Sequence, residues 1–144
     1  MGEVLQRSGY ARMPRGPMMV GPYPVLHPRA NVVRHALNLQ RLRVALNAKR
    51  REHGLRPTGI HVISWARSYR HNKEVGGASR SQHLFFGACD ISIQEIDRIF
   101  PWRGGRRDFD AVANRVFAKG GLGQYPAGNR HVDSRGYRAR WTTW

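Results

Sequence analysis

The order of apolar and polar positions predicts one long helix in the first half of the chain. Apolar residues recur at helical spacing through residues 30–53, and Gly54 follows as a stop signal. The apolar stripe consists of Val32, Val33, Ala36, Leu39, Leu42, Val44, Ala45 and Leu46. The basic residues of this helix, which we expect on its solvated side, are Arg34, Arg41, Arg43, Lys49, Arg50 and Arg51.

Shorter elements follow this helix. Residues 60–65 are rich in β-branched side chains and predict a strand, and residues 88–93 predict a second one. The polar, glycine-containing stretch 66–82 between them is typical of a long loop. Loops of that length in a compact domain are usually functional.

The last third of the chain predicts further helices and strands. Residues 94–100 fit a short helix that Pro101 ends, and apolar spacing up to Phe117 predicts another helix with Asp108 as its N-cap. Three glycines at 120, 121 and 123 break the chain, and residues 129–141 fit two short strands around a turn at 134–136. The fold class is therefore α+β, with a small, mostly antiparallel sheet and helices packed on it.

The first 29 residues have a different character. They contain five prolines and no periodic apolar pattern, which predicts an extended arm. We therefore divide the chain into an arm at residues 1–29 and one domain at residues 30–144, because a chain of 144 residues is the size of a single ordinary domain.

Charge narrows the class of partner without selecting one. The chain has 25 basic and nine acidic residues and a formal charge of +16, and only Lys49, Lys73 and Lys119 among the basic residues are lysines. Arginine forks pair with carboxylates and phosphates, so nucleic acid, an anionic wall polymer and an acidic membrane surface all fit.

Cysteine usage and hydropathy add two exclusions. Cys89 is the single cysteine, so neither an internal disulfide nor a cysteine-rich zinc cluster can form, and any metal must bind to histidine and carboxylate ligands. Cys89 alternates with Asp90 along its strand and is expected to point into the core. No apolar run is long enough for a signal core or a membrane span, so we expect a protein made in the cytoplasm without a signal peptide.

The candidate chemistry begins with histidine and aspartate. His83 precedes Asp90 by seven positions, and Gly87 between them can turn the chain so that the two side chains converge. Further along, His131 and Asp133 emerge on the same face of a strand, while Val132 points into the core.

Together these residues suggest a metal site. His83, Asp90 and His131 supply three nitrogen and oxygen ligands and leave the fourth position of zinc for water, as in catalytic sites. The simpler alternative treats them as a loop histidine, a capping aspartate and a hydrogen-bonded strand histidine. The residues alone leave both interpretations open.

Several ordered motifs resemble the zinc D-Ala-D-Ala carboxypeptidase family, which is grouped with lysostaphin-type endopeptidases and the Hedgehog signalling domain. The resemblance covers residues 39–141 approximately. The segments that carry it are 64–72, 75–79, 81–91, 121–126, 131–133 and 138–141, with Arg67, His83, Asp90 and His131 at matching positions.

The resemblance implies a fold, a metal and a substrate. It implies a Hedgehog-like α+β fold and one Zn²⁺ per chain on His83, Asp90 and His131. It also implies that Arg67 binds or polarises the substrate carbonyl or carboxylate, and that the substrate is a peptidoglycan stem peptide. Ser81 and Tyr125, which lie in matched motifs, are further candidates for substrate binding.

The general base departs from the family pattern. Similar carboxypeptidases often have an acidic residue three positions before the last histidine, and this chain has Gly128 there. Asp133 is the first candidate for the base and His71 the second, although either could instead orient the ring of a ligand. Asn129 and Arg130 stand where apolar residues are usual, which predicts a more exposed strand.

Three functions compete at this stage. The first is a zinc peptidase that cuts peptidoglycan stem or cross-link peptides, with anionic wall polymers as possible contacts of its basic surface. The second is a nucleic-acid-binding or other polyanion-binding protein, and the third is an inactive zinc-holding relative. A small wall hydrolase without a signal peptide or a wall-binding module is typical of phage endolysins and virion-associated enzymes, which reach the wall on lysis or inside the virion, so we expect this architecture here.

Overall fold

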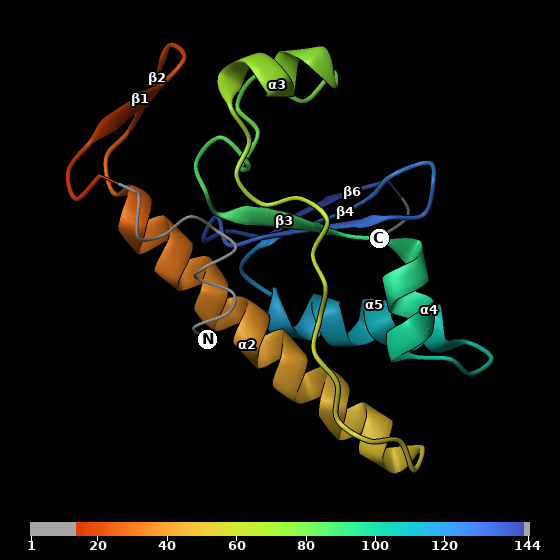
Figure 1. Cartoon of the computed structure of the whole chain (residues 1–144). Coiled ribbons are helices and arrows are strands. Elements are labelled where there is room, and N and C mark those ends of the chain that lie inside the picture. Colours follow the sequence, from red (N-terminus) through yellow and green to blue (C-terminus); the bar gives the residue numbers. More distant parts are fainter. Residues whose placement is uncertain (1–13, 143–144) are drawn as a thin grey trace.

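A four-stranded sheet organises the fold and has helices on both of its faces (Figure 1). The computed structural model describes residues 14–142. The sheet consists of β3 (Ala88–Ile91), β5 (Arg130–Asp133), β4 (Gly121–Gln124) and β6 (Ala139–Trp141), in that order. The β3/β5 and β5/β4 pairs are antiparallel and the β4/β6 pair is parallel, which confirms the α+β class and the mostly antiparallel sheet.

The long helix α2 (Pro28–Glu52) forms the base of the core. Pro28 occupies the first turn, where its missing N–H costs no hydrogen bond. At the other end, Gly54 has a φ of 70°, and the N–H groups of Gly54 and Leu55 donate to the carbonyl oxygens of Arg51 and Arg50. This Schellman motif is the stop that Gly54 predicted.

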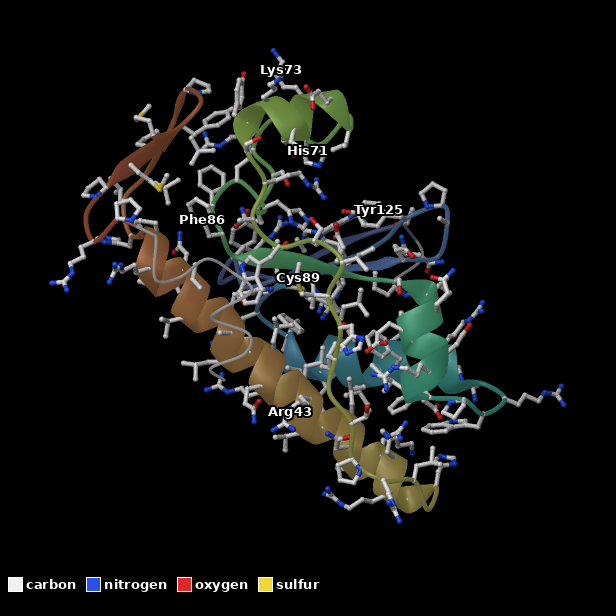
Figure 2. The ribbon with its side chains drawn as sticks, in the orientation of Figure 1. Arg43, His71, Lys73, Phe86, Cys89 and Tyr125 are labelled. Carbon is white, nitrogen blue, oxygen red and sulfur yellow. The ribbon has the colours of Figure 1, made fainter. Side chains whose placement is uncertain are left out.

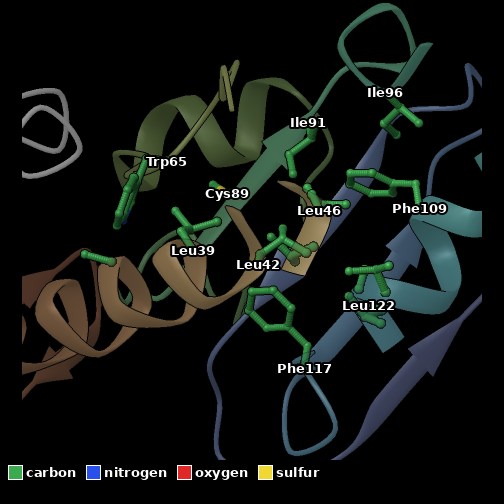
Figure 3. Packing of buried hydrophobic residues seen from close by; sticks show 14 of the residues in the cluster. Leu39, Leu42, Leu46, Trp65, Cys89, Ile91, Ile96, Phe109, Phe117 and Leu122 are labelled. Carbon is green, nitrogen blue, oxygen red and sulfur yellow. The ribbon is translucent and has the colours of Figure 1, made fainter. Parts of the chain in front are cut away.

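Side chains of α2 meet the sheet and the second long helix α5 (Gly105–Val116) in one apolar cluster (Figure 3). Leu39, Leu42 and Leu46 lie against this cluster from the side of α2. Cys89 and Leu122 enter from the sheet and are fully buried, so the predicted inward direction of Cys89 is confirmed. Figure 1 shows α2 and α5 on one side of the sheet and α3 (Tyr69–Glu74) on the other.

The segment predicted as a strand at residues 60–65 is not one. Its only ladder contact within the described residues is a bridge between Ser64 and Asp90. Side chains hold the backbone of this segment instead: Glu95 accepts a hydrogen bond from the His61 N–H at 2.8 Å, and Asn47 bonds to both the N–H and the carbonyl oxygen of Thr58. Extended backbone with buried apolar residues therefore looked like a strand in the sequence.

The predicted loop 66–82 contains the short helix α3, which begins after Ser68. The Ser68 hydroxyl accepts the His71 N–H at 3.1 Å, which is an ordinary N-cap. The predicted helix at 94–100 is α4 (Ile93–Ile99), capped by Ser92.

Two boundaries near α5 and β4 differ from the sequence prediction. Helix α5 begins at Gly105 and not after Asp108, and its N-cap is Gly104, which has a left-handed φ of 83°. A Cβ at Gly105 would lie 2.1 Å from the Phe100 carbonyl oxygen, so this close approach requires glycine. Two of the three glycines expected to break the chain, Gly121 and Gly123, lie in strand β4 (Gly121–Gln124), which is placed between β5 and β6. The two predicted C-terminal strands therefore exist but do not pair with each other.

Part of the predicted arm is folded. Residues Met18–Val20 (β1) and Tyr23–Val25 (β2) form an antiparallel hairpin, and Val20 and Val25 join the core. Gly21 turns the hairpin with a φ of 58°, and a Cβ there would lie 2.3 Å from the ring of Tyr69 on α3. The segment predicted as an extended arm thus includes a hairpin at residues 18–25, and residues 1–13 lie outside the described part of the chain.

No helix within residues 14–142 combines the length and the apolar character needed to cross a membrane.

The Glu95 contacts generate a stability prediction. Burial alone would raise the pKa of Glu95, but hydrogen bonds from Arg98 and from the His61 N–H lower it, so the buried carboxylate stays charged and holds residues 59–61 against α4. We expect Glu95→Ala to lower the free energy of unfolding by about 2 kcal/mol, because it leaves the His61 N–H without its partner.

Urea denaturation of the purified variant measures this change. Glu74→Ala is the matched control, since its ion pair with Arg70 is solvent-exposed and should contribute less than about 0.5 kcal/mol. Equal losses in the two variants would contradict the anchoring role of Glu95.

Candidate metal centre

Two strands and one turn position the three predicted ligands. His83 lies in the turn before β3, Asp90 on β3 and His131 on β5. The β3/β5 register places Asp90 directly opposite His131. All three side chains are buried, and the structure brings them together as the sequence predicted.

The turn that carries His83 is made differently from the prediction. Phe86, and not Gly87, has the left-handed conformation, with a φ of 64°. This conformation is sterically unfavourable for an aromatic residue. The Phe86 side chain is buried in the core and its carbonyl oxygen accepts the Trp65 indole N–H at 2.9 Å, which offsets the strain.

The facing ligand atoms form a nearly equilateral triangle. His83 Nε2 lies 3.2 Å from Asp90 Oδ1 and 3.2 Å from His131 Nδ1, and His131 Nδ1 lies 3.3 Å from Asp90 Oδ1. Zinc bonds of about 2.0–2.1 Å in a tetrahedron place neighbouring ligand atoms about 3.3–3.4 Å apart. The three atoms therefore fit one face of a zinc tetrahedron, with the fourth position open.

Hydrogen bonds on the other side of each ring set which nitrogen faces the site. His83 Nδ1 lies 2.6 Å from the Trp65 carbonyl oxygen, which can only accept, so Nδ1 carries the proton. His131 Nε2 lies 2.9 Å from Asp133 Oδ2, which likewise accepts. Lone pairs of His83 Nε2 and His131 Nδ1 are therefore directed at the centre, as metal binding requires.

Asp90 is charged and held on both oxygens. Oδ1 faces the two histidines, and Oδ2 accepts a hydrogen bond from Arg67 Nη2 at 3.0 Å. Burial raises the pKa of Asp90, but its close contacts with the rings of His131 and His83 outweigh this effect and hold that pKa well below its ordinary value. A carboxylate in this state is ready to bind a cation at neutral pH.

The base role predicted first for Asp133 does not fit its position. Asp133 is fully buried on the far side of the His131 ring, and its oxygens also accept from the Gly121 N–H and from the Arg135 guanidinium and N–H. Burial raises the pKa of Asp133, but the hydrogen bonds from His131 and Arg135 dominate and keep it charged. Asp133 instead orients His131, which was the alternative role.

The glycines of β4 make room for this arrangement, and the sequence interpretation missed their role. A Cβ at Gly121 would lie 2.1 Å from Asp133 Oδ2, and a Cβ at Gly123 would lie 2.0 Å from the Trp141 ring. Trp141 in turn packs 4.9 Å from the His131 ring, measured between centroids. The signal was available as the alternation Gly121-Leu122-Gly123, with a buried leucine between two glycines that face the site.

Tyr125 and Arg67 border the open side of the centre. The Tyr125 hydroxyl donates to Asp90 Oδ1 at 3.1 Å. Burial, followed by the nearby Asp90 charge, raises the pKa of Tyr125 to about 12, so the phenol is a neutral donor at physiological pH. Both residues therefore stand within reach of a group bound at the metal.

Ser81 and His71 lie further from the ligands. Ser81 supports the turn of His83, since its hydroxyl accepts the His83 N–H at 3.4 Å. His71 is on α3, where its N–H donates to the Ser68 hydroxyl and its Nδ1 lies 3.9 Å from Glu74 Oε2. Figure 2 shows His71 on the side of α3 that faces the sheet and Lys73 on the opposite side.

The segment before His131 is more buried than predicted. Arg130 is 4% exposed and forms an ion pair with Asp110 of α5, so a charged residue replaces an apolar one without exposing the strand. Gly128 has a φ of 90°, and a Cβ there would point at Ile93.

A buried histidine on α2 packs behind the site, on the helix side of the sheet. His35 is fully buried, its Nδ1 lies 2.8 Å from the Ser134 hydroxyl, and its ring stands at 89° to the Trp65 ring. Its Nε2 has no hydrogen-bond partner in residues 14–142. The Trp65 carbonyl oxygen contacts His83, and Ser134 directly follows Asp133 in the chain. The packing of His35 against Trp65 and Ser134 therefore supports the centre on both the His83 side and the Asp133 side.

We predict that Asp133→Asn lowers the affinity for Zn²⁺ by about ten- to a hundredfold, because an amide orients His131 less firmly and adds no charge. Competition with a zinc-binding dye measures the affinity. Asp97→Asn, which removes an exposed carboxylate paired with Arg106, is the control and should bind zinc as the wild type does.

His35 generates a pH prediction. Desolvation lowers the pKa of His35 to about 3, with smaller effects of opposite sign from Asp133 and of the same sign from His131 and His83. The unfolded chain binds this proton near pH 6.5, so the wild type should lose stability as the pH falls from about 6.5 towards 3. Urea denaturation across this range should show a flatter dependence in His35→Leu, and equal slopes would count against a neutral buried His35.

Comparison with known proteins supports the geometry. The family model described as peptidase M15 matches residues 26–100, which is half of the chain and includes His83 and Asp90. No curated protein matches the chain. His131 lies beyond the matched segment, and the β3/β5 register brings it to the other two ligands independently of the match. The chain therefore belongs to the peptidase M15 family of metallopeptidases, with His83, Asp90 and His131 as its buried group suited to a metal, and the resemblance to D-Ala-D-Ala carboxypeptidases is confirmed.

Proposed function

We propose that this protein is a zinc-dependent peptidase that hydrolyses stem or cross-link peptides of bacterial peptidoglycan. The observation that carries the proposal is the triangle of His83 Nε2, Asp90 Oδ1 and His131 Nδ1, with edges of 3.2–3.3 Å. Two imidazoles and one carboxylate are the donor set of catalytic zinc, and three protein ligands leave a position for water or substrate. Membership of the peptidase M15 family supports the choice of a peptide bond.

Zinc held on these ligands would supply a Lewis acid and a water of lowered pKa. Tyr125 acts as a neutral hydrogen-bond donor next to the carbonyl oxygen of the substrate, where negative charge develops. Arg67 keeps Asp90 charged and oriented, and its guanidinium adds positive charge on the same side of the site. A terminal carboxylate or the scissile carbonyl is the group that this charge would attract.

His71 is the proposed proton carrier. Asp133 is occupied on the far side of His131, and Gly128 offers no side chain, so neither can take a proton from water at the centre. His71 projects from the face of α3 that looks towards the sheet and is solvent-exposed. An imidazole can transfer a proton from water to the leaving amine near neutral pH.

The basic surface fits a role in holding the enzyme on its substrate. The acidic side chains of residues 14–142 all have hydrogen-bond or ion-pair partners, so the excess arginines are left to face solvent. Anionic wall polymers are the partners that this surface would attract in the same setting as peptidoglycan.

The decisive experiment measures zinc and hydrolysis together. We expect about one zinc per chain by elemental analysis, and release of amino groups from purified peptidoglycan that a chelator abolishes and added zinc restores. His131→Ala should lose the zinc and lower hydrolysis more than about a hundredfold, because one of three ligands is missing.

His27→Ala is the control for this variant, because His27 is exposed and makes no side-chain cap contact. Stoichiometric zinc without hydrolysis of any peptidoglycan would instead identify an inactive zinc-holding relative. A wild type without zinc would contradict the metal centre itself.

A further inference from the structure

A cavity lies beside the metal centre, between the start of α2 and the turn that carries His83. Its volume is about 220 Å³. Asn31 and Arg34 line it from α2, Gln82 from the turn, and Ser134 and Arg135 from the chain that leaves β5. None of the lining residues is acidic.

Arg34 gives this cavity an uncompensated positive charge. Its side chain makes no hydrogen bond or ion pair with any other residue in the range 14–142. The side-chain amide of Gln82 is likewise without a hydrogen-bond partner among those residues, so it can donate to a bound group. Within residues 14–142, the Arg34 guanidinium and the Gln82 amide group therefore have N–H donors left over for a bound group.

Arg135 connects the cavity wall with the metal centre through Asp133. Its guanidinium donates to Asp133 through Nε at 2.9 Å and Nη2 at 2.6 Å, and Asp133 accepts from His131 on its other side. The rings of Tyr137 and Trp141 lie 5.6 Å and 5.4 Å from the guanidinium carbon and hold the side chain in place. One carboxylate therefore separates the cavity wall from a metal ligand.

The charge of the cavity favours a monoanion. Arg135 and Asp133 neutralise each other, and Arg34 remains as one positive charge. A planar guanidinium matches the two oxygens of a carboxylate, and the neighbouring amide can complete the hydrogen bonds. Polymeric phosphates bind well to open arginine surfaces and need no recess of this kind.

We propose that this cavity binds a carboxylate of the peptide substrate and so makes the enzyme specific for acidic peptides. The inference rests on the proposed function, because the carboxylate must belong to a peptide whose scissile bond lies at the metal. Because Arg135 lines the cavity and contacts Asp133 behind His131, we expect the carboxylate to belong to a residue near the bond that is cut. Arg34 is the specificity residue, and Arg135 positions both the carboxylate and Asp133.

Paired peptides that differ in one group test the proposal. The first is L-Ala-γ-D-Glu-L-Lys-D-Ala-D-Ala, and the second has the free α-carboxylate of D-Glu converted to its amide. We expect the zinc-loaded wild type to have a kcat/KM about tenfold or more in favour of the acid, and Arg34→Gln to lose most of that preference.

Arg51→Gln is the matched control. Arg51 is an exposed arginine of the same helix at the opposite end from the cavity, and the substitution removes the same charge. This variant should keep the wild-type ratio. Thermal unfolding of both variants verifies that they remain folded, which the lack of partners of Arg34 leads us to expect.

The outcomes separate this proposal from the proposed function. Equal hydrolysis of both peptides by the wild type, or an unchanged preference in Arg34→Gln, overturns the carboxylate site and leaves the peptidase standing. Hydrolysis of neither peptide, nor of peptidoglycan, contradicts the peptidase.

In that case, calorimetry measures the binding of the tripeptide L-Ala-γ-D-Glu-L-Lys and of the same tripeptide with the D-Glu α-carboxylate converted to its amide. The comparison tests whether the cavity binds the carboxylate. A preference for the acid that Arg34→Gln removes supports the site. Equal or absent binding of the two tripeptides overturns it.

Discussion

Antiparallel pairing of β3 with β5 sets Asp90 opposite His131, and the buried polar groups of the molecule are arranged around that pair. The His83 turn adds the third ligand atom, and each ligand is then fixed from behind by a different part of the chain: Trp65 for His83, Arg67 for Asp90 and Asp133 for His131. Buried charge is costly unless it is paired, and here every charge of the centre has a partner. Contacts within the chain therefore set the position of each ligand.

The glycines of β4 contribute to the centre because they carry no side chains. Gly121 and Gly123 leave the space that Asp133 and Trp141 fill, so the residues that orient His131 pack directly against the backbone of β4. On the other side of the sheet, His35 packs under Trp65 and bonds to Ser134. The precision of the centre thus depends on residues in the helix layer as much as on the ligands themselves.

The ligands and the main helix could be predicted from the sequence because their signals are local. The stripe of α2 is periodic and Gly54 is a standard stop, while His83, Asp90 and His131 lie in motifs that resemble a known family. The failures share a different cause. Residues 60–65 are extended because Glu95 binds the His61 N–H and Asn47 binds the preceding backbone at Thr58. Strand β4 has glycines because Asp133 and Trp141 need the space. The burial of Asp133 behind the His131 ring depends on Arg135 and Gly121, which no spacing rule reveals.

The separation of the ligands along the chain has a consequence for folding. His83 and His131 are 48 residues apart, and the segment between them contains α4, α5 and β4. An ion that joins the two histidines closes this loop and removes chain entropy from the unfolded state, as a disulfide would, which corresponds to a few kcal/mol. In a protein whose one cysteine is buried and without a disulfide partner, such an ion would take the place of a covalent cross-link between these parts of the fold.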